Sequence, residues 1–272
     1  TSRLPPGVVP GLASLSGMIE TFMHIEHFGW HLYGLMGAPA TSGSGPDYTH
    51  TFSFGSLNQP YHTLGEEHRG LDTPDYLVHE GYVYNEMKVD VGKTDDAQVV
   101  SFGLYGKAQT EGVAPLDADP VKPTEDYLFR TFQGSVAVEG ETVGSVVNFS
   151  GTASNGYSED QGLLNAKPTP EGFILGNATA QGNITIRHRG SFYRQLAQAS
   201  TPFDVTLKWE LSAERSVEMV WHNLVIPQQA RDVQAGGLVE ISYPWQWDKP
   251  DDGVAPLTVT LKNGVATYDM PV

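Results

Sequence analysis

The chain has 272 residues, of which 39% are hydrophobic, so it can bury the core of one large all-β domain or of two smaller domains. It contains no cysteine, which excludes disulfides, thiolate zinc sites and cysteine nucleophiles. Its 32 acidic and 16 basic residues leave a net charge of −16, and such a surface repels polyanions such as nucleic acids. Solubility is the default explanation of this acidity.

Turn-forming residues are spread along the whole chain. Thirty glycines and 18 prolines favour short strands in a sandwich or barrel over long helices. No apolar run approaches the length of a transmembrane helix, and the first residues, TSRLPPGVVPGL, lack the apolar stretch of a signal peptide. We therefore expect a protein that is made in a cytoplasm.

Residues 1–14 contain three prolines, Pro5, Pro6 and Pro10, and little that a core could bury. Because proline cannot donate to a β ladder, we expect an extended arm that adds no strand to its own sheet. A frayed terminus is the alternative interpretation.

A strand and one short helix follow the arm. β-forming residues dominate from Met18 to Met23, and from Ile25 the apolar residues recur at helical spacings of three and four. These apolar residues are Ile25, Phe28, Leu32, Leu35 and Met36. Gly37, with Pro39 just beyond it, is typical of a helix end. The pattern predicts a packing helix with one apolar stripe.

The first half continues with a predicted strand at 48–57, a polar segment at 58–74 that is too irregular for an element, and a hairpin. The hairpin strands are expected at 82–91 and 97–109. Alternation in the first of them predicts a mostly dry face, interrupted by Asn85, and a wet face that meets water or a channel. The dry face holds Val83, Met87, Val89 and Val91, and the wet face holds Tyr82, Tyr84, Glu86, Lys88 and Asp90.

An acidic segment with several prolines at 113–130 is expected to link a first half at 15–112 to a second half at 131–272. Strands of the second half are predicted at 133–138, 143–152, 205–211, 217–226, 238–243 and 257–262.

A second short helix is predicted around Phe192 and Leu196, which repeat the spacing of Phe28 and Leu32. Ser191 is its predicted N-cap. The order strand, helix, strand, strand, strand thus occurs twice at an offset of about 165 residues, which indicates an internal duplication.

His24, His27 and His31 are three and four residues apart, a spacing at which imidazoles on one helical face can converge on a metal. The first of them falls at the junction of strand and helix, and no remote carboxylate cluster completes a ligand set. We therefore interpret these histidines as structural, and the Glu-Glu-His run at 66–68 likewise. No metal is expected.

No G-x-S-x-G, phosphate-binding glycine loop, H-E-x-x-H or dinucleotide fingerprint is present, so no catalytic residue or cofactor site is predicted. Trp245 and Trp247 could stack on a sugar, which makes a carbohydrate-binding β-sandwich module the alternative function. An aromatic cluster at a subunit interface explains the same two residues.

Taken in order, several segments resemble the major tail tube proteins of long-tailed bacteriophages, in particular the type in which two related halves are fused. They are the opening strand and F-x-x-x-L-x-x-x-x-G helix at 17–37, the YTHTF strand at 48–52, the hairpin at 82–110 and the GNITIRHRGSFYRQL stretch at 182–196. The resemblance rests on their order and spacing from Leu12 to Lys262.

The resemblance implies an all-β fold with short helices: a duplicated tail-tube β-sandwich with one short packing helix per half, whose inner sheets form a β-barrel tube on oligomerisation. It implies a structural subunit of the virion tail, stacked as rings into the conduit for DNA ejection, without catalysis or a cofactor. The implied partners are other copies of the chain and the tail terminator, tape measure and distal tail proteins. DNA passes without specific binding, no membrane is involved, and assembly is expected in the bacterial host cytoplasm.

Six wedges are expected for a ring in this family, so two similar halves imply three chains per ring. Six chains, each with one wedge and an elaborated second domain, are the alternative. Strand edges exposed in one subunit would be paired by the next.

A conduit lined with Lys and Arg would hold the DNA that it should release, so we expect carboxylates on the inner wall. The candidates are Glu86 and Asp90 on the first-half hairpin, and Glu210 and Glu218 on second-half strands. Contacts between stacked rings are expected from the loops at 58–74 and 154–170 and from the arm. The arm residues concerned are Leu4, Pro5, Pro6, Val8 and Val9.

Overall fold

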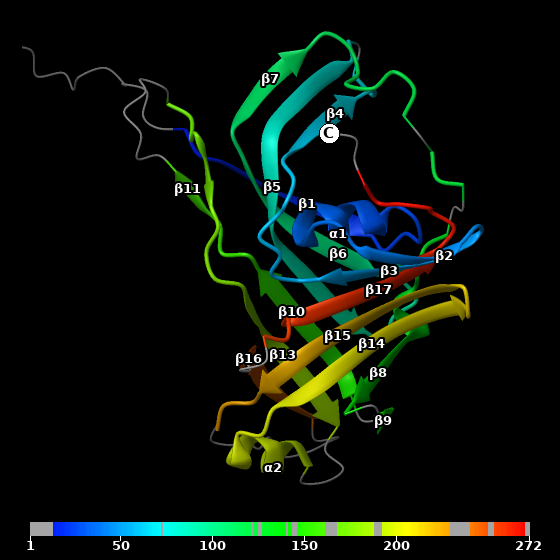
Figure 1. Ribbon diagram of the computed structural model, residues 1–272, viewed down its shortest axis with the longest axis vertical. Helices are drawn as coiled ribbons and strands as arrows, with labels where there is room; N and C mark the ends of the chain where they lie inside the picture. The colour runs from blue at the N-terminus through cyan, green and yellow to red at the C-terminus, as the bar shows by residue number, and fades with distance from the viewer. Residues whose placement is uncertain are drawn as a thin grey trace, which may run out of the picture.

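The computed structural model describes residues 13–71, 73–120, 122–124, 127–139, 141–142, 146–160, 168–187, 192–228, 240–249 and 253–269. Ser191 and the arm candidates Leu4, Pro5, Pro6, Val8 and Val9 lie outside the described residues. Strands predominate, and the described α-helices are α1 (Phe28–Met36) and α2 (Phe192–Ala199) (Figure 1). The expected all-β fold with short helices is confirmed.

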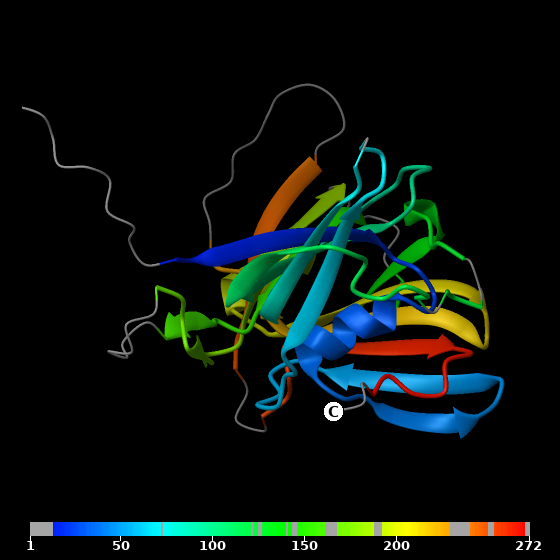
Figure 2. The ribbon, with the colours of Figure 1, turned by 90° about the horizontal axis from the view of Figure 1, so that it is seen from above.

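Two layers of antiparallel strands form a β-sandwich (Figures 1 and 2). The first layer contains β1 (Leu15–Phe22), β6 (Val99–Gly106), β5 (Asp75–Gly92), β10 (Val146–Ser154), β13 (Thr179–Arg187) and β16 (Glu240–Trp247), in that spatial order. The second layer contains β8 (Gly134–Val138), β14 (Phe203–Ser212), β15 (Arg215–Val225), β17 (Leu257–Asn263), β3 (Asp47–Ser53) and β2 (Ala40–Ser44), in that order. The layers join at one corner, where the ends of β15 and β16 pair.

Shorter elements extend this sandwich. β4 (His62–His68) and β7 (Ala108–Gly112) pair with the first part of β5, and β9 (Glu141–Thr142) pairs with β8. β11 (Ser158–Asp160) and β12 (Gly172–Ile174) form a separate ribbon, and Thr131–Gln133 is a 3-10 turn. β4 lies in the segment that was expected to be irregular, so that expectation was wrong. Its mostly polar, solvent-facing residues produce no apolar periodicity, and its pairing with β5 makes it a strand.

The core between the layers is built on large aromatic rings. Phe149 of β10 stacks on Trp245 of β16 with ring centroids 5.4 Å apart, and it lies 5.8 Å from Trp221 of β15. Trp221 and Trp245 are themselves 5.3 Å apart. Gly151 makes room for this cluster, because a Cβ there would lie 2.7 Å from Cζ2 of Trp221. The two layers therefore face each other through their apolar sides.

Helix α1 lies between the two layers (Figure 2). Seven of its nine residues are buried, so it is enclosed on more sides than the single predicted stripe. Gly29 and Gly34 allow this, because a Cβ at Gly29 would run into the ring of Tyr268 and one at Gly34 would lie 2.5 Å from Cδ2 of Tyr84. The helix ends where predicted, at Gly37, whose φ is 83° and whose N–H donates to the Tyr33 carbonyl at 2.8 Å.

Helix α2 packs on the sandwich through one side. Phe192 is 47% exposed and Leu196 is half-buried, whereas Tyr193 and Ala197 are buried. The Tyr193 ring stacks on Tyr243 of β16 at 6.1 Å. The helix predicted around Phe192 and Leu196 is therefore present, and Tyr193 and Ala197 are the residues that it buries.

The hairpin of β5 and β6 is confirmed, but two of its side chains point the other way. The pairing shifts register between Tyr84 and Glu86, so that Asn85 is one extra residue in β5. Tyr84 therefore lies opposite Leu104, on the same inward face as Met87, and it is buried. Tyr82 is buried as well, so the prediction of a wet face for these two tyrosines was wrong.

The end of the expected linker is packed into the sandwich. Phe129 is fully buried, and its N–H donates to the Met23 carbonyl at 3.0 Å. Its carbonyl accepts from the Gln98 N–H at 2.8 Å, and Leu128 forms a bridge with His24. Residues 127–130 thus connect the end of β1 to the start of β6 through backbone hydrogen bonds.

Candidate functional site

The outward face of the first layer is mostly polar, and the exposed apolar side chains of Met18, Phe22 and Val99 lie at its β1 edge. Strand register aligns its side chains in rows across all six strands. One row runs through Glu20, Ser101, Lys88, Thr152, Gln181 and Gln246. The opposite face of the same strands carries core residues such as Val89, Phe102 and Phe149. The alternation along each strand therefore makes one dry face and one wet face.

Amides and hydroxyls dominate this wet face. Its uncharged polar residues include Ser101, Asn148, Ser150, Thr152, Ser154, Gln181, Asn183, Thr185, Ser242 and Gln246. Its charged residues are the acidic Glu20, Glu86, Asp90 and Glu240 and the basic Lys88 and Arg187. Arg187 forms an ion pair with Glu240 at 3.2 Å. Four acidic residues against two basic ones leave this described face slightly acidic.

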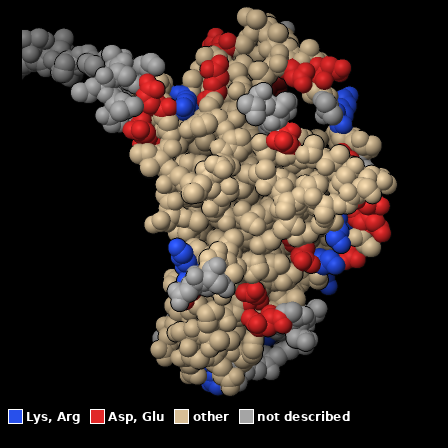
Figure 3. All heavy atoms as spheres, in the orientation of Figure 1, with Lys and Arg blue, Asp and Glu red and all other residues tan. Residues whose placement is uncertain are grey.

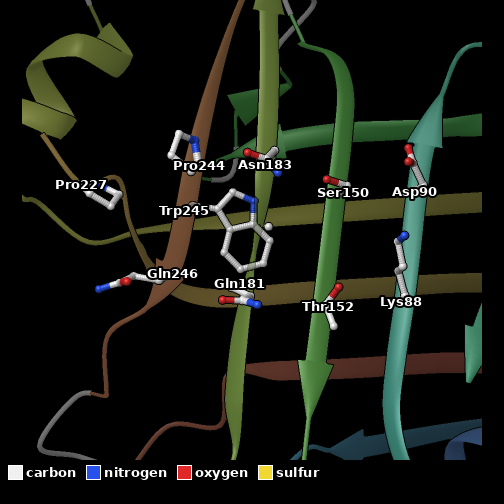
Figure 4. A pocket seen from close by; sticks show the side chains of 11 residues that line it. Lys88, Asp90, Ser150, Thr152, Gln181, Asn183, Pro227, Pro244, Trp245 and Gln246 are labelled. Carbon is white, nitrogen blue, oxygen red and sulfur yellow. The ribbon is translucent and has the colours of Figure 1, made fainter. Parts of the chain in front are cut away.

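An open groove lies in the middle of this face (Figure 4). Lys88 and Asp90 of β5 line it together with side chains of β10, β13 and β16, and the strands of the second layer cross behind (Figure 4). Asp90 is exposed, and its Oδ1 accepts from Asn148 Nδ2 at 2.7 Å. Glu86 is half-buried further along β5, on the same face. The structure thus places these two residues on the same face of β5.

Glu210 and Glu218 lie on the outward face of the second layer instead. Lys208 forms an ion pair with Glu210 and stands opposite Glu218 in the pairing of β14 with β15. The hydrogen bond and charge of Lys208 lower the pKa of Glu210. Because the two layers pack through their apolar sides, their outward faces point away from each other. The four candidate carboxylates therefore belong to two surfaces, and a single channel wall can hold one pair only.

The charge of the chain is distributed over its surface. Figure 3 shows acidic residues in several separate groups on the visible face, some beside Lys or Arg. On the second layer, Lys208 and Lys262 balance Glu210 and Glu218. The excess of acid over base within the sandwich strands is thus greater on the first layer.

The three histidines near α1 have different surroundings. His31 Nδ1 is 3.0 Å from the Tyr84 hydroxyl, and its ring stacks on Phe102 at 5.1 Å. Burial, together with the smaller effects of the charges of His27 and His62, lowers the pKa of His31 to about 4. His24 and His27 face each other with ring centroids 4.8 Å apart. Within the described ranges, no group of three His, Asp or Glu side chains is arranged to hold a metal ion.

The Glu-Glu-His run at 66–68 belongs to strand β4. Glu66 accepts from His79 Nε2 at 2.9 Å through one oxygen, and its other oxygen lies 2.9 Å from His68 Nε2. The hydrogen bond from His79 lowers the pKa of Glu66. Glu67 pairs with Arg69 at 2.7 Å. These contacts tie β4 to β5 and to the turn between them.

The two tryptophans of the YPWQW segment do not form an exposed platform. Trp245 is 2% exposed in the core, and Trp247 is half-buried against it. A sugar ring could not stack on Trp245 without opening the sandwich, so this part of the argument for a carbohydrate-binding module fails.

Sequence reasoning missed the amide and hydroxyl face as a surface because it searched for charge. The signal was present in N-F-S-G-T-A-S at 148–154 and Q-G-N-I-T-I-R at 181–187, where every second residue is polar. Alternation of this kind predicts a half-exposed strand, and the neighbouring register makes one continuous face of several such strands.

Comparison with known proteins gives one positive result. No curated protein matches the chain. A family model described as "Phage tail tube protein" matches residues 1–247, which is most of the chain, so the chain belongs to this family. This confirms the resemblance to phage tail tube proteins seen in the sequence and supports a structural role in the virion tail. Across the described residues, no helix has the length and apolar character needed to cross a membrane.

Proposed function

We propose that this chain, as a member of the phage tail tube protein family, closes into rings that stack into the tail tube and conduct DNA during ejection. The polar face of the first layer is the proposed inner wall. The observation that carries this proposal is the composition of that face: amides and hydroxyls concentrated on β10, β13 and β16, with a small acidic excess over the layer.

Such a wall suits a polyanion that must move. Binding of DNA depends on exchanging condensed counterions for contacts between phosphate and Lys or Arg. On the described face Arg187 is paired with Glu240, and Lys88 stands between Glu86 and Asp90 on the same strand. Phosphates therefore meet few cations there, and the carboxylates repel them.

The edges of the first layer suit closure into a ring. Among the described strands, β1 pairs only with β6, and β16 pairs with β13 and only at its end with β15. An unpaired strand edge is a template for another chain. We propose that β1 of one subunit and β16 of the next complete the wall.

Ring size follows from strand number. Six strands from each of three chains make an 18-stranded wall, and about 4.8 Å between strands with a tilt of about 40° gives a backbone diameter of about 36 Å. That lumen admits a DNA duplex with little spare room after side chains are added. Six such chains would double the diameter, so we propose three chains per ring.

An internal duplication of the chain would also support three chains per ring. The order strand, helix, hairpin occurs as β1, α1, β2 and β3 and again as β13, α2, β14 and β15. Leu15 and Thr179 begin the two strands and Phe28 and Phe192 begin the two helices, an offset of 164 residues in both cases. We propose that the tail terminator, tape measure and distal tail proteins are the other partners, and that assembly occurs in the host cytoplasm.

Two of the candidate carboxylates lie on the proposed inner wall and two on the opposite face, so the second pair is a matched control for the first. Virions with Glu86→Lys and Asp90→Lys should deliver DNA poorly, whereas Glu210→Lys and Glu218→Lys change the charge equally on the opposite face and should deliver it normally. Equal delivery by both would refute the assignment of the wall.

Images of purified protein test the assembly itself. We expect rings or tubes with approximate six-fold symmetry, and native mass spectrometry of a ring should show three chains. A six-chain ring would contradict the proposed number. A small species that never assembles but binds glycans would favour the carbohydrate-binding alternative.

A further inference from the structure

A second groove lies between β1 and the strands β4 and β5, and Met18 at its margin shares the outward face of β1 with Glu20. It encloses about 620 Å³. Its lining includes the apolar side chains of Met18, Ile19, Leu64, Tyr82 and Leu104. Leu104 and Tyr82 are buried at its base, and Met18 is 65% exposed at its margin. A groove with this lining suits an apolar stretch of chain better than a charged ligand.

Two carboxylates of β4 stand at the same groove, Glu66 and Glu67. Each already has a partner, His68 or His79 for Glu66 and the largely exposed Arg69 for Glu67. Because both carboxylates can accept further hydrogen bonds, they can receive one additional cation. The groove thus combines an apolar base with an acidic margin.

The start of the described chain is held against the ribbon of β11 and β12. The Ala13 N–H donates to the Pro168 carbonyl at 2.7 Å, and Ser14 Oγ donates to Glu159 Oε1 at 2.7 Å. Phe173 fixes the ribbon by packing near Tyr61 and Tyr105, with ring centroids 6.3 and 6.1 Å away. The described chain therefore begins beside the ribbon. To enter its own groove, the chain would have to double back along Leu15–Ile19, which line it.

The arm sequence complements this groove. Residues 1–14 contain one charged residue, Arg3, followed by the apolar Leu4, Val8 and Val9. The groove on the polar face has a carboxylate in Asp90, but Lys88, hydroxyls and amides line most of it, so it is a poor match for the apolar residues of the arm. Arg3 is ten residues before Ala13, and ten residues of extended chain are about 30 Å long. This is enough to reach an adjacent subunit.

We infer that the groove between β1 and β4 receives residues 3–9 of the arm of a second copy. This inference rests on the proposed self-assembly, and it identifies the arm of one subunit and the groove of another as the surfaces in contact. Apolar arm residues cover Met18 and Leu64, and Arg3 pairs with the carboxylates of β4. Because Pro5, Pro6 and Pro10 lack an N–H, side-chain contacts rather than a full β ladder hold the arm.

The absence of cysteine makes a crosslinking test clean. In the double variant Met18→Cys, Val8→Cys, oxidation of assembled protein should link neighbouring chains into a covalent ladder on a non-reducing gel. The matched control is Ala213→Cys with Val8→Cys, because Ala213 is exposed at the turn between β14 and β15 and should give no link. Assembled tubes with no interchain link at Met18, or a link within one chain, would overturn the inference and leave the proposed function standing. A wild-type chain that never assembles would overturn both.

Charge reversal tests the polar part of the contact. Arg3→Glu should slow tube growth about two- to fivefold, the range expected for one exposed ion pair, and Glu67→Lys should restore it. An unchanged rate in Arg3→Glu, or a further loss in the double variant, would contradict the pairing.

Discussion

Helices α1 and α2 begin with Phe at positions 164 residues apart and carry Leu four residues later, but the fold treats them differently. Seven residues of α1 are buried, whereas two of α2 are. The first helix lies between the layers (Figure 2), whereas the second lies at one end of the sandwich (Figure 1) and stacks Tyr193 on Tyr243, on the inward face of β16. Equal spacing therefore identifies a helix without determining how much of it a protein encloses.

The difference arises from what packs against each helix. Tyr268 from the C-terminal segment and Tyr84 from β5 close on α1 from two sides, and its glycines leave room for both rings. The Tyr268 hydroxyl also donates to the Glu26 carbonyl at 2.7 Å, which ties the C-terminal segment to the turn before α1. Helix α2 contains no glycine, and among the described residues Tyr243 is the aromatic strand residue stacked on it.

The largest difference between the two helices is expected from alanine substitution of the first phenylalanine of each. Phe28→Ala should lower the free energy of unfolding by about 3–5 kcal/mol, because Phe28 is fully buried and packs near Phe102. Phe192→Ala should change it by less than about 1 kcal/mol, because that ring is largely exposed. Chemical denaturation of both variants measures the difference. Equal losses would contradict the difference in burial between the two helices.

Acid should act on the α1 region and not on α2, which has no histidine. The pKa of His31 is lowered to about 4, first by burial and then by His27 and His62, so between that value and about 6.5 the unfolded chain binds a proton that the folded chain does not. The free energy of unfolding should therefore fall by up to about 3 kcal/mol as pH drops through this window.

Two variants separate this effect from general acid sensitivity. His31→Gln should flatten the dependence of stability on pH, with a residual slope because burial also lowers the pKa of His50 and of His62. His68→Gln is the control, because its side chain is half exposed. An unchanged slope in His31→Gln would contradict the assignment.

A larger residue at Gly29 tests how tightly α1 is enclosed. Gly29→Ala should lower the free energy of unfolding by about 1–3 kcal/mol, because the new methyl group must displace the Tyr268 ring. Gly17→Ala is the matched control, since nothing lies within 4 Å of a Cβ at that position in β1. A stable Gly29→Ala variant would show that α1 can move between the layers.

The smallest effect is expected from removal of metal. His24, His27 and His31 contact different neighbours, so treatment with a chelator should leave the melting temperature unchanged. Elemental analysis that finds one equivalent of zinc, nickel or iron, lost in His27→Ala or His31→Ala, would reverse this interpretation.

Local patterns predicted much of the secondary structure. The hairpin of β5 and β6, the strands β14, β15 and β17, and the helix end at Gly37 were all found close to their predicted positions. In each case the signal lies within a few residues: alternation of apolar and polar residues, apolar residues at helical spacing, or a glycine at the end of a helix. The strand β4 had no such signal, because its polar residues form a strand only through pairing with β5.

By itself, the sequence determined the strand-rich composition, the absence of disulfides, the acidic charge and the segment order that marks the family. Tertiary structure decided which face each side chain occupies. One extra residue at Asn85 turned Tyr84 inward, and the packing of two layers separated Glu86 and Asp90 from Glu210 and Glu218. The physical reason is that side chains alternate with a period of two, so register and layer stacking, which depend on distant strands, assign the faces.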